Sequence, residues 1–356
     1  MERPGARTTR PAKRARPSPP ADGAQPVAAA EAAHLFEPLT RHDHIALAVS
    51  GGSDSTALLW LVARWQCAVA DPPSVTVLTV DHGLRPGSAE EARQVVALAA
   101  SCGLPGLALA WQGRKPRTGL QQAAREARYG LLTDWCRTNA VPALLTAHTS
   151  DDQAETFLMR LARGSGLDGL AGIGDSRRNG IDILRPLIGV SRARLRATLK
   201  HADVSWIEDP SNRDERFERV RWRRVLETLA AEGVEAADIA LASRRLARAR
   251  QALEEPLRQL VAAAVACPSD ARAEIDRALF EAAPEELRIR LLKAVMEKIG
   301  GVTVELQALE RLESALRAGS PARTLSGCRV GRKADRILIT REGPRGRAEN
   351  RAGKPG

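Results

Sequence analysis

Residues 45–60 read Ile45-Ala-Leu-Ala-Val-Ser-Gly-Gly-Ser-Asp-Ser-Thr-Ala-Leu-Leu-Trp60, and this stretch decides the fold. A short apolar run ends in two adjacent glycines, three polar residues follow, and an apolar-periodic segment then begins. The pattern predicts a strand, a tight turn and a helix. Adjacent glycines let backbone N–H groups approach an anion closely, and the helix N-terminus adds unsatisfied donors and the positive end of its dipole.

The hydroxyl-bearing residues of this turn add further donors to the same concavity. They are Ser50, Ser53 and Ser55, so the turn is a candidate phosphate cradle. It is not a Walker A loop, because no G-x-x-x-x-G-K-[ST] pattern occurs in the chain. The same residues also fit a plain Gly-Gly turn with a Ser/Asp helix cap, which is common in α/β proteins.

The composition favours a polyanionic partner. The 356 residues carry a formal net charge of +11, and a basic balance of this size is typical of proteins that bind nucleic acid. An arginine-rich codon usage would give the same balance. Five cysteines without C-x-x-C spacing argue against a zinc ribbon, an iron–sulfur cluster or a disulfide framework and agree with a cytoplasmic location. We expect no membrane-spanning segment, no signal peptide and no obligate protein partner.

The order of apolar runs predicts an α/β protein. Strands are expected at 45–49, 75–80, 107–111 and 143–147, with helices at 56–65, 89–100 and 120–137 between them. This alternation is typical of a doubly wound parallel sheet of the Rossmann-like type, with its ligand at the carboxyl ends of the strands. A smaller, mostly helical domain that ends in a short strand pair is predicted to follow, with helices at 239–265, 285–299 and 304–316 and strands at 324–330 and 336–340.

We therefore divide the chain into four parts. They are a disordered basic tail at 1–33, a catalytic domain at 34–231, a helical domain at 232–342 and a second basic tail at 343–356.

Residues capable of chemistry follow two of the predicted strands. Asp81 and His82 follow the second strand, and His148 follows the fourth. Ser150 and Gln153 have the spacing of a capping box, which predicts a helix from about residue 151. On that helix Asp152 and Glu155 share one face, while Phe157, Leu158 and Leu161 are expected to face the core. Acids in a first helical turn also occur simply because they stabilise the helix dipole.

The loop 50–55 resembles the PP-loop of the N-type ATP pyrophosphatases, which cleave ATP between the α- and β-phosphates and adenylate an oxygen of the substrate. The resemblance extends further, because several blocks occur in the order seen in the tRNA(Ile)-lysidine synthetases. These blocks are the loop itself, Asp81-His-Gly-Leu-Arg85, Ala124-Arg-Glu-Ala-Arg-Tyr129, Ala147-His148 with Asp152 and Glu155, Arg163-Gly-Ser-Gly-Leu-Asp-Gly-Leu170, Arg185-Pro-Leu187 and Glu208-Asp-Pro-Ser-Asn212.

This resemblance implies an activity: the wobble cytidine of an isoleucine tRNA with a CAU anticodon is adenylated at O2, and the ε-amine of free lysine then displaces AMP. The implied ATP-binding residues are Ser50, Gly51, Gly52, Ser53, Asp54, Ser55, Asp81, His82, Arg128 and His148. Asp54 is further implied to hold Mg²⁺. Asp152, Glu155 and Arg223 are implied to bind lysine and complete the catalytic site.

Arginines of the second half are candidate tRNA-phosphate contacts. They are Arg219, Arg244, Arg245, Arg248 and Arg250. For any one of them a solvated helix face is an equally simple explanation, and the run 219–223 also fits a generic RNA-facing patch.

The sequence departs from the family pattern at two positions. Thr149 stands where the family usually has a second histidine, and Val220 stands in place of an asparagine. The chain also ends where longer members continue, so we expect a short form of the family.

Two rival functions remain open from the sequence. Another PP-loop enzyme, such as a tRNA thiolase or an amide-forming synthetase, would share the loop, but the paired cysteines usual for sulfur insertion and an amidotransferase nucleophile are not evident. A tRNA-binding relative without catalysis is the other rival, and the presence of Asp54, Asp152 and Glu155 argues against it.

Overall fold

The structure, a computed structural model, describes residues 24–342 except Arg85, Arg114, Arg117, residues 209–215 and Phe217. Most of the segment 208–212, predicted to belong to the active site, therefore lies outside the described residues, and so does Arg85. Residues 1–23 and 343–356 of the predicted tails lie outside them as well.

The prediction of a disordered tail is wrong for residues 24–33. Helix α1 (Ala29–Phe36) begins there, and it buries Ala32 and Phe36. Val27 is also buried, and its N–H donates to Oγ1 of Thr198 at 2.8 Å. This segment has few apolar residues, but they fall on one side of a helix. There they pack into a core that later elements of the chain form, and this is enough to order the helix.

The described residues fold into two compact units. Among them, residues 24–164 and 169–244 belong to one unit, and residues 165–168 and 245–342 belong to the other. The predicted domain boundary at residue 231 precedes helix α9 (Ala236–Ala252), whereas the two units divide within that helix at Arg244.

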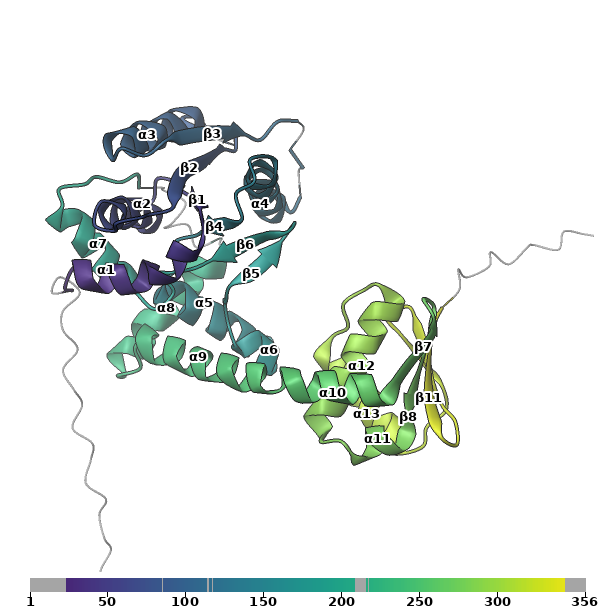
Figure 1. The fold of residues 1–356 in the computed structure, drawn as a ribbon. Coiled ribbons are helices and arrows are strands. Elements are labelled where there is room, and N and C mark those ends of the chain that lie inside the picture. The colour runs from purple at the N-terminus through teal and green to yellow at the C-terminus, as the bar shows by residue number, and fades with distance from the viewer. Residues whose placement is uncertain are drawn as a thin grey trace, which may run out of the picture. The chain divides into compact units, whose positions relative to one another are not determined.

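The first unit contains a six-stranded sheet in the order β3-β2-β1-β4-β6-β5 (Figure 1). Its strands are β1 (His44–Ala48), β2 (Ser74–Asp81), β3 (Gly106–Ala110), β4 (Ala143–Leu145), β5 (Ser176–Arg178) and β6 (Ile181–Leu184). All pairs are parallel except β5–β6. The chain therefore runs outward from β1 in both directions, and the crevice between the carboxyl ends of β1 and β4 is the topological switch point, where such sheets bind ligands.

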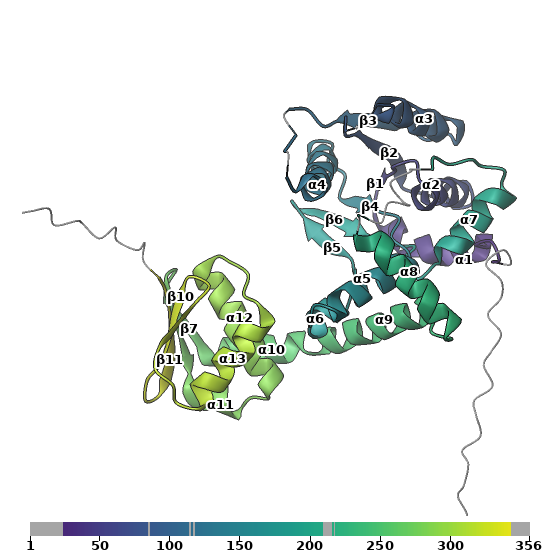
Figure 2. The ribbon, with the colours of Figure 1, turned by 180° about the vertical axis from the view of Figure 1, so that it is seen from behind.

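Helices cover both faces of this sheet, as the sequence predicted (Figures 1 and 2). Those that join its two cores are α1, α2 (Ser53–Gln66), α3 (Ser88–Ser101), α4 (Leu120–Thr138) and α7 (Arg192–His201). The chain also forms α5 (Ser150–Leu161), α6 (Leu167–Leu170), α8 (Glu218–Ala231) and a short 3-10 helix at Glu37–Arg41. Ile45 and Leu47 of β1 face one core, which α1, α2, α3 and α7 complete. Ala46 faces the second core with Tyr129 and Leu132 of α4. Strand alternation thus produces two buried faces.

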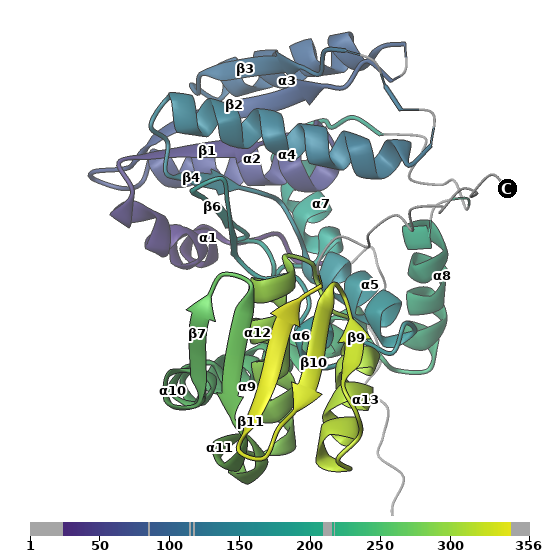
Figure 3. The same cartoon turned by 90° about the vertical axis from the view of Figure 1, so that its right-hand side faces the viewer.

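The second unit packs helices on one face of a five-stranded antiparallel sheet, which Figure 3 shows face-on with the strand order β7-β8-β11-β10-β9. Its strands are β7 (Val265–Ser269), β8 (Arg272–Asp276), β9 (Arg323–Leu325), β10 (Cys328–Arg332) and β11 (Arg336–Arg341). Its helices are α10 (Glu254–Ala264), α11 (Arg277–Ala282), α12 (Glu285–Gly300) and α13 (Leu306–Arg317). Inward side chains such as Ile275, Val330 and Ile339 meet Leu292 and Leu309 in one core.

The predicted elements of this unit are present, but two details differ. The strand pair is part of a larger sheet, because the prediction overlooked β7 and β8 and joined β9 to β10 across a turn at Ser326 and Gly327, both of which have positive φ. The single helix predicted at 239–265 is two helices, α9 and α10, which are separated at Leu253.

Candidate active site

The phosphate loop connects β1 to α2 as predicted, and helix α2 begins at Ser53. Gly52 is the N-cap residue and has no side chain to cap the helix, so the first-turn N–H groups are left for an external acceptor. Within the loop, Oγ of Ser55 lies 3.2 Å from Oγ of Ser50 and donates to the Gly52 carbonyl at 3.1 Å. The loop and the helix end therefore present backbone N–H and hydroxyl donors of the kind that bind an anion, and binding of ATP phosphates here stays a prediction.

Gly51 is required for two separate reasons. Its φ of +87° lies in the left-handed region, and a Cβ at this position would lie 2.6 Å from Cδ1 of Ile207. The Ile207 N–H also donates to the Gly51 carbonyl at 2.9 Å. The loop thus has a backbone conformation that a larger residue would strain, and the segment before residue 208 packs directly against it.

Helix α5 supplies the predicted acids, but its cap differs from the prediction. Thr149 is the N-cap residue, and it forms a capping box with Asp152 rather than Ser150 with Gln153. The Thr149 N–H and hydroxyl both donate to Oδ2 of Asp152 at 2.9 Å. Gln153 instead binds the turn at Ile173 through both ends of its amide. The cap fixes the Asp152 carboxylate, and Oδ1 remains directed toward the site.

The buried positions of α5 also differ from expectation. Asp152 and Glu155 are buried, whereas Leu161 is 51% exposed instead of facing the core. Phe157 and Leu158 are half-buried. The helix therefore turns its acidic face, and not its apolar one, toward the carboxyl end of the sheet.

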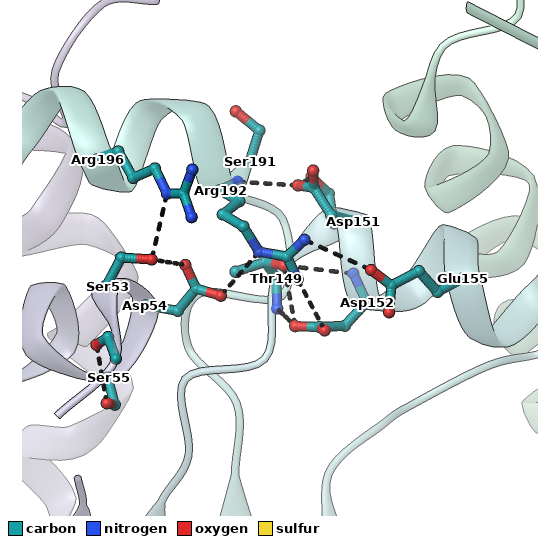
Figure 4. Close-up of polar contacts among 12 residues, drawn as sticks. Ser53, Asp54, Ser55, Thr149, Asp151, Asp152, Glu155, Ser191, Arg192 and Arg196 are labelled. Carbon is teal, nitrogen blue, oxygen red and sulfur yellow. Dashed lines mark hydrogen bonds and ion pairs between the residues drawn. The ribbon is translucent and has the colours of Figure 1, made fainter. Parts of the chain in front are cut away.

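A guanidinium that the sequence analysis did not single out lies among these acids (Figure 4). Arg192 is the first residue of α7, and its side chain is 17% exposed. Its Nε lies 3.1 Å from Oδ2 of Asp54, Nη2 lies 3.2 Å from Oδ1 of Asp152, and Nη1 lies 3.4 Å from Oε1 of Glu155. One arginine thus links the phosphate loop to the acidic face of α5.

Arg223 of α8 joins the same cluster, while its role in lysine binding stays a prediction. Its Nε donates to Oε1 of Glu155 at 2.7 Å. The Glu155 side chain is fully buried, yet its Oε2 has no hydrogen-bond partner. A buried carboxylate oxygen without a donor is costly and indicates a place for a cationic or N–H-bearing ligand.

Two pKa shifts describe the electrostatics of this cluster. Burial raises the pKa of Asp54, although Arg192 opposes this shift. Burial also acts on Asp152, but the charge of Arg192 and the hydrogen bonds from Thr149 outweigh it and hold the pKa of Asp152 below its usual value. Asp152 is therefore ionised at neutral pH.

His148 lies in a cationic neighbourhood beside the acids. Its Nδ1 is 2.9 Å from Oγ1 of Thr146. Burial, followed by the charges of Arg185, Arg125 and Arg219, lowers the pKa of His148 to about 4 despite the opposing influence of Asp152. The imidazole is therefore neutral at physiological pH, and it can exchange hydrogen bonds with a ligand without adding charge.

The surrounding arginines gather around Tyr129, the single tyrosine of the chain. The guanidinium carbons of Arg125 and Arg178 lie 5.1 and 5.4 Å from the centroid of its ring, within cation–π range. The adjacent Arg128 has an exposed side chain, and partial desolvation followed by the charge of Arg125 lowers the pKa of its guanidinium. These arginines give this part of α4 an anion-attracting character.

The other predicted site residues lie on several elements. Asp81 ends β2, and its Oδ1 accepts from the Ser88 hydroxyl at 2.6 Å and from the Gly83 N–H at 3.0 Å, which lowers its pKa. Nδ1 of His82 accepts from the Leu84 N–H. Both residues organise the loop before α3, and their contact with ATP stays a prediction.

The predicted tRNA-binding arginines lie on α8 and α9. Arg219 is half-buried near His148, whereas Arg244, Arg245 and Arg248 are exposed on α9, and Arg250 is half-buried.

Within the described ranges, no group of three or more histidine, cysteine, aspartate or glutamate side chains has the arrangement of a metal site. The described part of the chain also contains no helix long and apolar enough to cross a membrane.

Sequence reasoning missed Arg192, although one local signal was present. Ser191 precedes it, and the Ser191 hydroxyl caps α7 by accepting from the Arg194 N–H. A serine N-cap after the block 185–187 places the next residue at the start of a helix. Its acidic partners, however, are distant in sequence and could not be identified from that signal.

A parallel sheet with a glycine-serine loop after its first strand, at the switch point, defines the PP-loop class of ATP-using proteins. The model of the PP-loop domain family matches residues 24–229, which is more than half of the chain. Among solved structures, the U34-tRNA thiolase NcsA of Methanococcus maripaludis superposes with a TM-score of 0.52 at 14% identity, covering 64% of this chain and 79% of the thiolase. That likeness shows the fold alone.

Relatives that match over nearly their whole length identify the family within this class. A tRNA(Ile)-lysidine synthase of Bradyrhizobium diazoefficiens is 42% identical over 93% of this chain and 99% of its own length. One from Methylobacterium sp. strain 4-46 is 45% identical over the same shares. The chain belongs to the tRNA(Ile)-lysidine synthase family.

Proposed function

We propose that this protein is an ATP-dependent ligase that joins free lysine to C2 of the wobble cytidine of an isoleucine tRNA with a CAU anticodon. Family membership supports lysidine formation on this tRNA. The single structural observation that carries the proposal is that two buried acids, Asp152 and Glu155, contact the same guanidinium as Asp54 of the phosphate loop. That guanidinium belongs to Arg192. An ammonium-binding pair beside an ATP cradle suits a reaction between an activated base and an amine.

The first half-reaction requires a bound polyphosphate. The first-turn N–H groups of α2 and the hydroxyls of Ser50, Ser53 and Ser55 would hold the phosphates of ATP, and the arginines near His148 would stabilise charge on the α-phosphate. Cytosine O2 attacks the α-phosphorus, the bond to the β-phosphate breaks, and pyrophosphate leaves. The base becomes an O2-adenylate, and AMP is the leaving group for the next step.

Magnesium fits this site through Asp54. The described residues offer no three-residue metal cluster, but Mg²⁺ is usually held by one or two carboxylates together with substrate phosphates. Asp54 stands at the first turn of α2, where its carboxylate borders the phosphate concavity. The ion would neutralise the polyphosphate and the departing pyrophosphate.

The second half-reaction requires a lysine held as an ammonium and then deprotonated. Asp152 and Glu155 supply the carboxylates, and the unpartnered Oε2 of Glu155 is an acceptor for one of its N–H groups. After loss of a proton the amine attacks C2, the C2–N bond forms, and the C2–O bond to AMP breaks. A lysine amine is not nucleophilic while it is protonated, so acceptors beside the reacting carbon are required.

The direct test of the function is incubation with ATP, radiolabelled lysine and total tRNA. We expect one isoleucine tRNA to become labelled, with stoichiometric release of pyrophosphate and AMP. Binding of tRNA without transfer of lysine would contradict the proposal and favour a non-catalytic relative. Incorporation of sulfur from a sulfur donor would instead favour a thiolase.

A second test separates the residues of the two half-reactions. Asp152→Asn and Glu155→Gln should each raise the KM for lysine by roughly 10- to 100-fold, the scale of losing a charge-assisted hydrogen bond. Lysine-free adenylation, followed as pyrophosphate release, should change much less. Equal loss in both assays would assign the pair to ATP or metal binding.

A further inference from the structure

Arg192 occupies the centre of the acidic cluster, at the place where the acids would contact a cationic ligand (Figure 4). Each of its three nitrogens meets a different carboxylate, at 3.1, 3.2 and 3.4 Å from Asp54, Asp152 and Glu155. Its backbone N–H is also fixed, because it donates to Oδ2 of Asp151 at 2.8 Å. The guanidinium is therefore held in place from both ends.

The charges of this cluster nearly balance. Three carboxylates face the guanidiniums of Arg192 and Arg223, which leaves one net negative charge. Asp151 and Arg196 add one charge of each sign at the edge, where Arg196 Nε donates to the Ser53 hydroxyl. The remaining deficit is a single positive charge, and the unpartnered Oε2 of Glu155 lies in this cluster.

Without Arg192 the same residues would carry two net negative charges. Neighbouring carboxylates with an excess of two negative charges favour a divalent ion over an ammonium. The proposed reaction, however, requires a metal ion at the phosphates and an amine at Asp152 and Glu155. Some feature of the chain must keep the two cations in separate places.

We propose that Arg192 determines this selectivity: its fixed positive charge leaves Asp152 and Glu155 able to accept a monovalent ammonium but not a divalent metal ion. The inference rests on the proposed function for the identity of the ammonium as lysine. Arg192 acts through the carboxylates and is a positioning residue.

An arginine suits this role better than a lysine. Its fork presents separate N–H groups to three acceptors in one plane, whereas a lysine ammonium would sit as a compact point charge. A lysine at this position would also resemble the substrate that the cluster is meant to accept.

The test measures Mn²⁺ binding by electron paramagnetic resonance on the full chain, without ATP or tRNA. Arg192→Gln should bind Mn²⁺ at least about tenfold more tightly than the unaltered protein, because one more uncompensated charge attracts a divalent ion. Free lysine should compete with this Mn²⁺. The matched control is Arg194→Gln on the same helix, whose guanidinium binds Glu31 instead, and its Mn²⁺ affinity should not change.

Two further variants test whether the net charge of the cluster causes the change in Mn²⁺ affinity. Arg192→Lys keeps the charge and should show no gain. The double variant Arg192→Gln/Asp152→Asn restores one net negative charge and should lose the gain. A folded Arg192→Gln protein without tighter Mn²⁺ binding, or a gain that survives in the double variant, would overturn the proposal.

A measurement that does not depend on Arg192→Gln being folded uses Asp152→Asn alone. With Arg192 present, this change should leave the weak Mn²⁺ affinity as it is, and a tenfold loss would show that the acids bind metal despite Arg192. Because none of these assays requires turnover, their failure is distinguishable from a failure of tRNA labelling by lysine.

Discussion

Each unit buries arginine–carboxylate contacts, and the two cases differ in their charge balance. In the second unit Arg288 and Glu313 form a pair with side chains 8% and 3% exposed, and Nε donates to Oε1 at 2.6 Å. Arg288 also donates to the Ala283 carbonyl. In the first unit three carboxylates share Arg192 and Arg223, and one buried oxygen of Glu155 has no partner.

The difference distinguishes a structural pair from a binding site. A one-to-one pair whose hydrogen bonds are satisfied has nothing left to offer a ligand, and its role is to join α12 to α13. An unbalanced cluster at the switch point of a parallel sheet is destabilising unless a ligand completes it. Burial of charge alone therefore does not indicate function, whereas an uncompensated remainder of charge does.

The largest effect is expected from breaking the balanced pair. Glu313→Gln leaves the buried Arg288 guanidinium without its carboxylate and should lower the free energy of unfolding by about 3 kcal/mol or more. Urea denaturation followed by circular dichroism measures this. The double variant Arg288→Met/Glu313→Leu should recover most of the loss. Equal losses in the single and double variants would show that the pair contributes net stability.

In the unbalanced cluster we expect a substitution to reduce activity and to leave stability nearly unchanged. Asp54→Asn should leave the fold intact but reduce pyrophosphate release at least ~100-fold, the scale of removing a main charge-stabilising contact. The reason is that an amide is a poor ligand for Mg²⁺. Asp151→Asn is the matched control, since it changes a neighbouring acid of the same cluster and should cost far less. Near-normal activity in Asp54→Asn would place the metal elsewhere.

A smaller effect concerns His148, which burial and the charges of nearby arginines keep neutral against the opposing charge of Asp152. Its pKa is lowered from 6.5 to about 4 in the folded protein, so between these values the unfolded chain binds the extra proton. The stability that His148 contributes is complete above pH 6.5 and is lost as pH falls. Between pH 7.5 and 5.0 the unaltered protein should lose about 2 kcal/mol more than His148→Gln in urea denaturation. Parallel losses in both proteins would show that His148 titrates normally.

The smallest effects on stability are expected where arginines have no acidic partner at all. Within the described part of the chain, Arg244, Arg245 and Arg248 form no ion pair. Their joint replacement by Gln should change stability by no more than about 0.5 kcal/mol per site. If they contact tRNA phosphates, the slope of log affinity against log salt should fall by roughly three.

Exposed arginines that already bind acids provide the control for that experiment. Arg93 pairs with Glu90, and Arg137 pairs with Asp134. Their replacement by Gln should leave the salt slope unchanged. An unchanged slope in the α9 variant as well would remove these arginines from the tRNA interface.

Local patterns were sufficient to predict strands β1 to β4 and helices α2 to α5 of the first unit, whereas α1, β5, β6 and α7 were not predicted. The phosphate loop and the strands around it depend on neighbouring residues, so the predicted strand 45–49 and the observed His44–Ala48 nearly coincide. Caps are less certain because Thr149 and Ser150 both have an acceptable partner three residues later. Only the tertiary contact of Gln153 with Ile173 decides between them.

Contacts between distant residues could not be predicted in this way. Arg192 meets its acids through the topology of the sheet, which places α7 beside α2 and α5, and its partners have no recognisable spacing in the sequence. Strands β7 and β8 were not predicted because both are short. In addition, β7 contains Pro268 at the edge of its sheet, and three of the five residues of β8 are charged. Strand β8 exists through pairing with β11, and β7 exists through pairing with β8, rather than through their own propensity.

The position of Tyr129 has a spectroscopic consequence. Because the chain contains one tyrosine, biosynthetic incorporation of fluorotyrosine would give a single ¹⁹F resonance. That ring lies close to Arg125 and Arg178, so its chemical shift would respond if either guanidinium moved away to meet an anion. One nucleus would thus report the binding of an anion beside this ring in real time, without a reconstituted reaction.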